Sequence, residues 1–443
     1  MLLIGNGRLI TNNAENPFIE DGCVVVEDGL IKDYGKTSDM KAAYPNGDFE
    51  DAHGRVIMPG LINMHTHIYS SFARGMSLDQ PEPNRNFLDV LENMWWRMDK
   101  QLTIEDTKYS AYATLLEGVR CGVTTVFDHH ASPYHIDGSL FTIADAAKDI
   151  GVRASLCYEV SDRDGEEIAN KGIEENAAFI RHVQKDSSDM LVAMMGLHAS
   201  FTLSDKTLDK AVAAIEGTGA GCHVHIAEGE ADVEDSLKKY EKRVVERLYD
   251  HGVLGEKSLA VHCIHIDSRE MDILADTNTP VIHNSESNMG NAVGCSPIFT
   301  MMEKGILLGM GTDAYTQDMF ESLRVANLIH RHELGEPSIG FGETLGMLFQ
   351  NNRKIAGRHF STPLGIIEKG AAGDIVIVDY NPHTPLNANT TGGHLMFGIM
   401  GRNVDSTIIG GKFVMRDRKI VTVDEEKILA NSRAQVTDFW KRV

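Results

Sequence analysis

Gly60-Leu61-Ile62-Asn63-Met64-His65-Thr66-His67 is the stretch on which the fold and the chemistry of this chain depend. An apolar run leads directly into two histidines separated by one residue. Side chains alternate between the faces of a β-strand, so His65 and His67 are expected to project together from the end of a buried strand. Two neighbouring imidazoles make half of a metal site, because neutral histidine nitrogen binds zinc and iron. An isolated pair is more often structural, so the prediction needs further ligands.

The chain has 443 residues, enough for one large domain and a smaller one. Its hydrophobic content of 42% is ordinary for a soluble protein, and no segment is long and apolar enough to span a membrane. A net charge of −22 would repel phosphate backbones, so nucleic acid is not an expected partner. The start of the chain lacks the layout of a signal peptide and the six cysteines are scattered, which favours a cytoplasmic protein.

Both ends of the chain are rich in predicted strands. Residues 23–31 and 407–414 each contain two apolar runs joined by an Asp-Gly or a Gly-Gly pair, which is a hairpin pattern. Residues 374–378 are another strand candidate. We therefore predict one small β-sandwich domain built from residues 1–58 together with residues 358–443.

In the middle of the chain, from residue 59 to residue 357, short apolar strands alternate with amphipathic helices. Thr103 fits a helix cap, because the acidic Asp106 follows three positions later. Strand candidates include residues 122–128, 222–227, 259–262, 279–284 and 306–311. Repeated strand–helix units imply a parallel sheet, and their number favours a (β/α)₈ TIM barrel over an open doubly wound sheet. No Gly-x-Gly-x-x-Gly follows an early strand, which also argues against a dinucleotide fold.

Metal-ligand and acid–base residues end four of the predicted strands. In a TIM barrel such residues meet, because the chemistry lies at the carboxyl ends of the strands. The residues are His65 and His67, then His223, His225 and Glu228, then His262, and finally Asp313. Each one alone could be structural, but their joint occurrence predicts one site. Residues 128–130 are interpreted as packing or lining residues, and Trp95-Trp96 as helix core, with pocket wall as the alternative.

The same stretches resemble motifs of the amidohydrolase superfamily, in its deaminase and chlorohydrolase branch. Residues 59–67 are similar to the first-strand motif, and residues 225–228 to the His-x-x-Glu of that branch. Residues 261–263 and 311–313 are similar to the sixth- and eighth-strand motifs. The resemblance covers nearly the whole chain. It implies a metal-dependent TIM barrel with a flanking β-sandwich, hydrolysis of a non-peptide carbon–nitrogen bond, and a homodimer.

Carried over residue by residue, the resemblance implies the metal ligands His65, His67, His225 and Asp313. His223 is a rival, since it shares a strand face with His225, but only His225 stands three residues before Glu228. Residues 193–200 contain no lysine of the kind that bridges two metals in binuclear relatives, which favours a single ion. Three nitrogens, one carboxylate and an open water position suit Zn²⁺, with Fe²⁺ as the alternative.

The leading hypothesis is hydrolytic deamination of a purine-like or other nitrogen heterocycle by water that the metal activates. Asp313 would accept the water's proton, Glu228 would protonate a ring nitrogen, and His262 would hydrogen-bond the substituent on the reacting carbon. His198 and Asn288 are the candidate substrate contacts. Two alternatives stay open: ring opening of a cyclic amide at the same site, and a catalytically silent scaffold.

Overall fold

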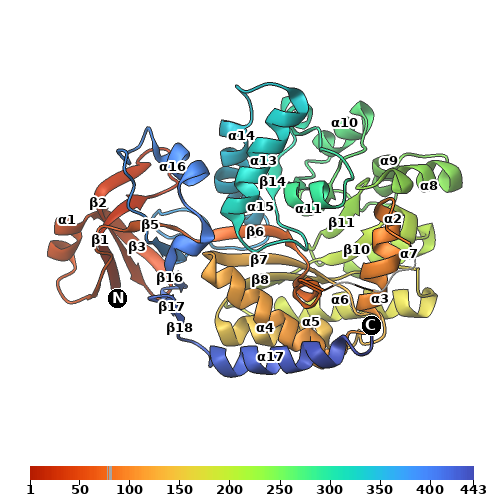
Figure 1. The fold of residues 1–443 in the computed structure, drawn as a ribbon, viewed down its shortest axis with the longest axis horizontal. Helices are drawn as coiled ribbons and strands as arrows, with labels where there is room; N and C mark the ends of the chain where they lie inside the picture. Colours follow the sequence, from red (N-terminus) through yellow and green to blue (C-terminus); the bar gives the residue numbers. More distant parts are fainter. Residues whose placement is uncertain (77, 79–81) are drawn as a thin grey trace.

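The computed structural model describes residues 1–76, 78 and 82–443, and its centre is a ring of parallel strands (Figure 1). The ring strands are β6 (Leu61–Thr66), β7 (Val123–His130), β8 (Arg153–Tyr158), β10 (Met195–Ala199), β11 (Cys222–Ile226), β12 (Leu259–His262), β13 (Val281–His283) and β14 (Leu308–Met310). Strands β6 to β8 pair side by side, and so do β10 to β14. Parallel bridges from Val160 to Leu197 and from Thr66 to Asp313 join the two groups. The predicted alternation of strands and helices is therefore arranged as a closed parallel barrel.

Helices follow the barrel strands along the chain and flank them (Figure 1). They are α4 (Ile104–Arg120), α5 (Ser139–Ile150), α6 (Glu166–Val183), α7 (Asp205–Ile215), α8 (Glu230–Tyr240), α9 (Val244–Asp250), α10 (Ser268–Asp276), α11 (Ser285–Gly290), α12 (Ile298–Glu303), α13 (Met319–Leu334), α14 (Phe341–Leu345), η4 (Gly346–Asn351) and α15 (Asn352–Ala356). The predicted cap at Thr103 is confirmed, because Thr103 and Asp106 form a reciprocal capping box at the start of α4.

Short helices connect β6 to α4 and lie near the carboxyl ends of the barrel strands. They are η1 (Ile68–Ala73), α2 (Phe87–Val90), η2 (Leu91–Trp95) and α3 (Trp96–Asp99). The segment η1 begins directly after His67, and its position is held by the Ile68 amide, which donates to Asp128 Oδ1 at 2.7 Å. Residues 128–130 end β7, so this strand supports the segment that follows the histidine pair.

Both ends of the chain contribute to one nine-stranded sheet. Its strands are β1 (Leu2–Ile10), β2 (Phe18–Glu27), β3 (Leu30–Lys36), β4 (Asp48–Asp51), β5 (Val56–Pro59), β15 (Ile375–Val378), β16 (Val404–Ile409), β17 (Lys412–Arg416) and β18 (Lys419–Ile420). Strand β15 pairs antiparallel with β5, which joins the two ends of the chain. Both predicted hairpins are confirmed as β2–β3 and β16–β17. Division of the sheet into two facing layers and the domain boundaries stay predictions.

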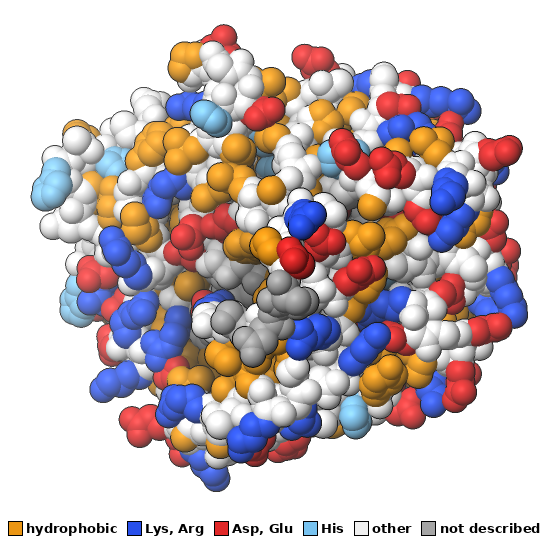
Figure 2. Space-filling view, turned by 45° about the vertical axis from the view of Figure 1, so that its right-hand side comes forward, with side chains coloured by type: hydrophobic (Ala, Val, Ile, Leu, Met, Phe, Trp, Pro, Cys, Tyr) orange, Lys and Arg blue, Asp and Glu red, His pale blue; other side chains and the backbone are white. Residues whose placement is uncertain are grey.

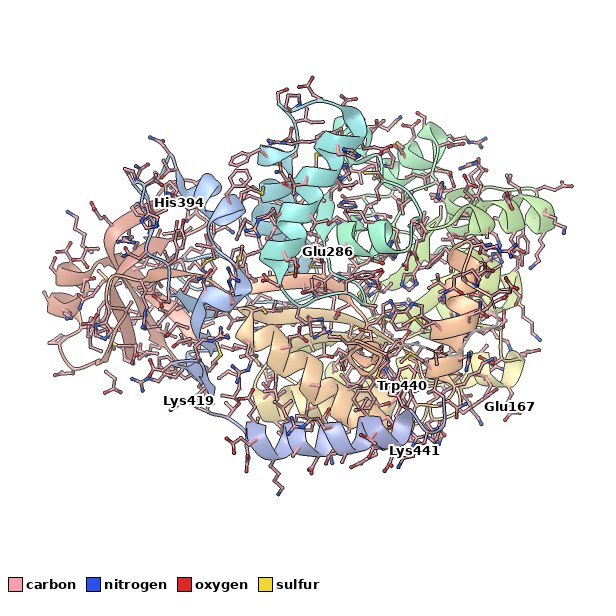
Figure 3. All side chains as sticks on the ribbon, viewed as in Figure 1. Glu167, Glu286, His394, Lys419, Trp440 and Lys441 are labelled. Carbon is pink, nitrogen blue, oxygen red and sulfur yellow. The ribbon has the colours of Figure 1, made fainter. Side chains whose placement is uncertain are left out.

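The shorter remaining elements are β9 (Leu191–Ala193), α1 (Thr37–Ala43), α16 (Thr391–Phe397), η3 (Ser200–Thr202) and η5 (Gly401–Asn403). The last helix, α17 (Glu425–Phe439), leaves the terminal sheet and runs along α4 of the barrel (Figure 1). Trp440, labelled in Figure 3, donates its ring N–H to the carbonyl of Phe72 at 2.6 Å. The end of the chain is thereby attached to η1 at Phe72, five residues after His67.

The surface carries charges of both signs. Figure 2 shows acidic and basic side chains interspersed over one face, although the net charge of the chain is −22. Among the residues that the structure describes, every helix is too short or too polar to cross a membrane.

Candidate metal centre and active site

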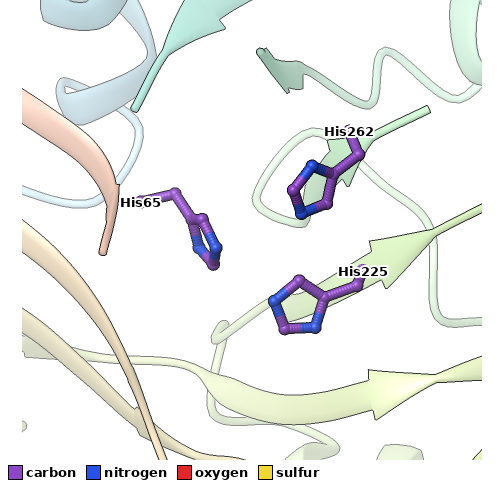
Figure 4. Close-up of side chains that lie close together, drawn as sticks. All are labelled: His65, His225 and His262. Carbon is purple, nitrogen blue, oxygen red and sulfur yellow. The ribbon is translucent and has the colours of Figure 1, made fainter. Parts of the chain in front are cut away.

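Three histidines from three different strands turn their rings toward one another (Figure 4). His65 comes from β6, His225 from β11 and His262 from β12, and one ring nitrogen of each lies within 4.8 Å of the others. In the described part of the chain, Nε2 of His65 and Nε2 of His262 are buried and have no hydrogen-bond partner. Buried polar atoms almost always have a partner, so these nitrogens are suited to a ligand.

His67 and His225 provide the clearest sign of a cation site. Nδ1 of His67 donates to the carbonyl of His129 at 2.6 Å, and Nδ1 of His225 donates to the carbonyl of His198 at 2.8 Å. Because a carbonyl can only accept, Nε2 of each neutral ring carries a lone pair. The two Nε2 atoms lie 3.3 Å apart. Lone pairs at this distance repel each other, whereas a cation between them would be bound by both. Histidine ligands are typically oriented by such backbone carbonyls.

Asp313 adds a carboxylate to the histidine cluster. Its Oδ1 lies 3.4 Å from Nε2 of His67 and 3.9 Å from Nε2 of His65. The amides of Thr312 and Asp313 both donate to the carbonyl of His65 at 2.9 Å, so the backbone ties the end of β14 to β6. Ser287 donates to Oδ2 of Asp313 at 2.6 Å. The donor set of three imidazoles and one carboxylate fits a divalent ion such as zinc.

His223, the rival of His225, lies behind His65. Its Nε2 is 2.9 Å from Nδ1 of His65, so one ring nitrogen of His65 contacts His223 while the other turns toward the cluster. Burial and the neighbouring histidines hold the pKa of His65 and of His225 well below the ordinary value, which keeps their nitrogens available as ligands. The geometry favours His225 over His223, as the motif suggested.

Glu228, His262 and Asp313 form a second group within the same site. Nε2 of His262 lies 3.3 Å from Oε2 of Glu228 and 3.6 Å from Oδ2 of Asp313. Burial, together with the charge of Asp313, raises the pKa of Glu228 well above its ordinary range. A protonated Glu228 can donate a hydrogen bond or a proton at neutral pH.

Asn288 fixes the orientation of His262 rather than lining the cavity. Its Oδ1 accepts from Nδ1 of His262 at 2.8 Å, and its amide nitrogen donates to Ser296 at 3.3 Å. The Nε2 atom of His262 therefore faces the carboxylates. A direct contact between Asn288 and substrate stays a prediction.

A cavity of about 620 Å³ opens above this cluster. His67, His225, Glu228 and Asp313 line it, as does the predicted substrate contact His198. Its wall also includes Tyr69 of η1, Trp95 and Trp96. Both tryptophans are half-buried and line the cavity, so the preferred interpretation as helix core is corrected to the alternative, pocket wall.

Glu159 was not singled out in the sequence, although it also lines the cavity. It directly follows β8, as Glu228 and Asp313 closely follow β11 and β14. Its side chain is 4% exposed, and its Oε2 lies 3.1 Å from Nδ1 of His129. Its position as an acidic residue at the end of a barrel strand is the sequence feature that could have identified it as a site residue.

A model of the amidohydrolase family matches residues 56–414. The chain belongs to the amidohydrolase family. This amidohydrolase is 31% identical to a 5′-deoxyadenosine deaminase from Methanosarcina mazei over all of this chain and 99% of that protein. It is 30% identical to a 5-methylthioadenosine/S-adenosylhomocysteine deaminase from Desulforudis audaxviator over 92% of each chain. The family membership expected from the sequence motifs is confirmed.

Two solved structures share the fold of this amidohydrolase. An adenosine deaminase from Xanthomonas campestris with bound zinc superposes with a TM-score of 0.86 at 22% identity, covering 100% of this chain and 99% of that one. The atrazine chlorohydrolase TrzN from Arthrobacter aurescens, complexed with zinc, has a TM-score of 0.83 at 22% identity, covering 98% and 100%. The similarity extends over the barrel and over the sheet formed by both ends of the chain.

Proposed function

We propose that this amidohydrolase is a metal-dependent aminohydrolase that removes an amino group from a purine-type heterocycle. The observation that carries the proposal is the pair of lone pairs on His67 and His225, 3.3 Å apart and next to the Asp313 carboxylate. The names of the relatives, which are deaminases of adenosine-type compounds, support a purine substrate. No observation of this structure favours ring opening of a cyclic amide over deamination.

The proposed ligands of the ion are His65, His67, His225 and Asp313, and zinc is the preferred metal because both similar solved structures contain it. An ion bound there would act as a Lewis acid that makes water nucleophilic at neutral pH. We propose a single ion, because both ring nitrogens of the nearby His129 already contact oxygen atoms, 3.1 Å from Glu159 and 3.0 Å from the carbonyl of His223.

Each acid–base residue of the site has its own role in the proton transfers of the reaction. Asp313 accepts the proton of the attacking water, and Ser287 keeps its carboxylate oriented through the 2.6 Å hydrogen bond. Glu228, protonated because of its burial, donates to the ring nitrogen beside the attacked carbon. His262, whose Nδ1 is held by Asn288, accepts a hydrogen bond at Nε2 from the amino group on the attacked carbon. Ammonia then leaves with the proton that Asp313 holds, and the hydroxyl group of the intermediate returns its proton to Glu228 as the carbonyl forms. Acid–base assistance of this kind contributes about 10²–10⁴-fold to the rate.

A substrate panel read by two methods tests the proposal. Zinc-loaded enzyme is incubated with 5′-deoxyadenosine, methylthioadenosine, S-adenosylhomocysteine, adenine, 2,6-diaminopurine and guanine. We expect ammonia release together with exchange of the amino group for oxygen, detected by mass spectrometry. Gain of one water without ammonia would instead indicate ring opening. Absence of ammonia from every compound, with full metal occupancy, contradicts the proposal.

A pair of histidine variants serves as the control. His225→Gln removes a proposed ligand and is expected to abolish both metal retention and ammonia release. His53→Gln makes the same chemical change at a side chain that is 72% exposed, and it should leave both unchanged. Equal metal content in the two variants would exclude His225 as a ligand.

A further inference from the structure

Glu159 is a charged group in the cavity that the proposed reaction does not use. His129 lies between two acceptors, with Nδ1 at 3.1 Å from Oε2 of Glu159 and Nε2 at 3.0 Å from the carbonyl of His223. Both ring nitrogens of His129 are therefore engaged, and the contact with Nδ1 occupies Oε2 of Glu159. Burial alone would raise the pKa of the Glu159 carboxyl, but the charges around it, that of Arg163 included, hold the pKa well below its ordinary value, so Glu159 is a carboxylate. Its second oxygen, Oε1, has no hydrogen bond to any described residue.

His198 presents a lone pair beside that free oxygen. Nδ1 of His198 lies 2.7 Å from the hydroxyl of Thr202, whose own hydrogen goes to the carbonyl of Ala199 at 3.1 Å. The hydroxyl can therefore only accept from His198, so Nδ1 carries the hydrogen and Nε2 carries the lone pair. Nε2 lies 3.9 Å from Oε1 of Glu159. Two acceptors face the same part of the cavity and cannot bond each other.

A second metal ion is not the best occupant of this place. Glu159, His198 and His225 could supply three ligand atoms within 4.8 Å of one another. However, Nδ1 of His225 donates its hydrogen to the carbonyl of His198, and Nε2 of His225 faces His67. Only two ligand atoms remain, fewer than a zinc site uses. A group that brings its own hydrogens satisfies the same two acceptors.

We propose that Glu159, together with His198, is a specificity determinant that binds an N–H donor of the heterocycle. The preferred substrate then carries a second exocyclic amino group in addition to the amino group that it loses. This inference rests on the proposed function and narrows its substrate class. The donor belongs to the ring system rather than to a distant substituent, because Glu159 lies within 4.8 Å of nitrogens of His67 and His225. Carboxylates bind the amino groups of nucleobases in this way.

Binding of matched heterocycles to zinc-loaded enzyme tests this assignment. 2,6-Diaminopurine and adenine differ by one amino group beyond the one that is lost, and so do 2,6-diaminopurine riboside and adenosine. Dissociation constants are measured by rapid-mixing fluorescence titration, on a timescale shorter than one turnover. We expect the compound with the extra amino group to bind about 10- to 100-fold more tightly in each pair, as for a hydrogen bond to a charged group. Equal affinities within both pairs, or no binding of any compound, would overturn the proposal.

Glu159→Gln tests the residue itself. The amide of the new side chain can donate to His198, so the preference should fall to about 2-fold or less, roughly the loss of one charged hydrogen bond. Glu167→Gln is the matched control, since Glu167 is 84% exposed at the edge of the molecule (Figure 3). A preference retained in Glu159→Gln contradicts the proposal. Should that variant fail to fold, the wild-type pairs still decide.

The two proposals can fail separately. Selective binding without ammonia release would contradict deamination and leave the donor subsite intact. Ammonia release without selectivity within the pairs would contradict the role of Glu159 and leave deamination intact.

Discussion

At the scale of single residues, the site is organised by where hydrogens lie on imidazole rings. Backbone carbonyls of His129 and His198 hold the Nδ1 hydrogens of His67 and His225, which leaves the Nε2 lone pairs facing each other. The motifs predicted which histidines meet, because strand alternation and strand ends follow from local pattern. They could not predict which nitrogen faces the cluster, since the deciding carbonyls come from neighbouring strands.

Glu228→Gln separates acid catalysis from metal binding. The amide keeps the size of the side chain but cannot deliver a proton, so kcat should fall by about 10²–10⁴-fold. Metal content should not change, because Glu228 is not a proposed ligand. Ammonia release and metal analysis on the same preparation provide the measurement. An active variant would show that another group protonates the ring.

At the scale of elements, the ends of the barrel strands carry unusual backbone. Ala227, His262 and Asp313 all have positive φ, with values of 45°, 69° and 56°. Residues other than glycine rarely adopt this conformation, which costs on the order of 1–3 kcal/mol each and is concentrated at functional sites. The strand β12 was predicted to the residue from its apolar run. The left-handed turn at its end has no such local signal, since it is imposed by contacts between strands.

Gly311→Ala probes the close contact between β14 and β6. A methyl group at Gly311 would lie 2.6 Å from Oδ1 of Asn284 and 2.8 Å from the backbone nitrogen of His65. Neither contact is tolerated, so we expect a loss of about 1–3 kcal/mol in the free energy of unfolding. Displacement of His65 should also reduce activity and metal retention. Denaturant unfolding measures the first effect.

Gly255→Ala is the matched control for this prediction, because a methyl group there would meet no atom within 4 Å. Wild-type stability in Gly311→Ala would mean that the two strands can separate without cost.

At the scale of the whole molecule, distant parts of the sequence meet in two places. Strand β15 completes the sheet begun by β1 to β5, and α17 crosses back to α4 of the barrel. The first arrangement was predicted, because both ends share a hairpin-rich composition. The second was not, since the partner of an amphipathic helix cannot be read from its own periodicity. Glu159 was not predicted for a different reason. The strand before it, Arg153–Tyr158, contains polar residues that weaken the apolar pattern expected of a buried strand.

Metal removal should weaken the fold as a whole. The proposed ligands come from β6, β11 and the end of β14, and β6 and β14 are the first and last strands of the ring. An ion that binds only the folded chain stabilises it by about 2.7 kcal/mol at a hundredfold excess over its dissociation constant. Chelation should therefore lower Tm by several degrees, and added zinc should restore it. His225→Gln should begin at the lower Tm and gain nothing from zinc. Metal analysis first confirms that removal is complete. If Tm is then unchanged, the ion binds outside this junction of strands.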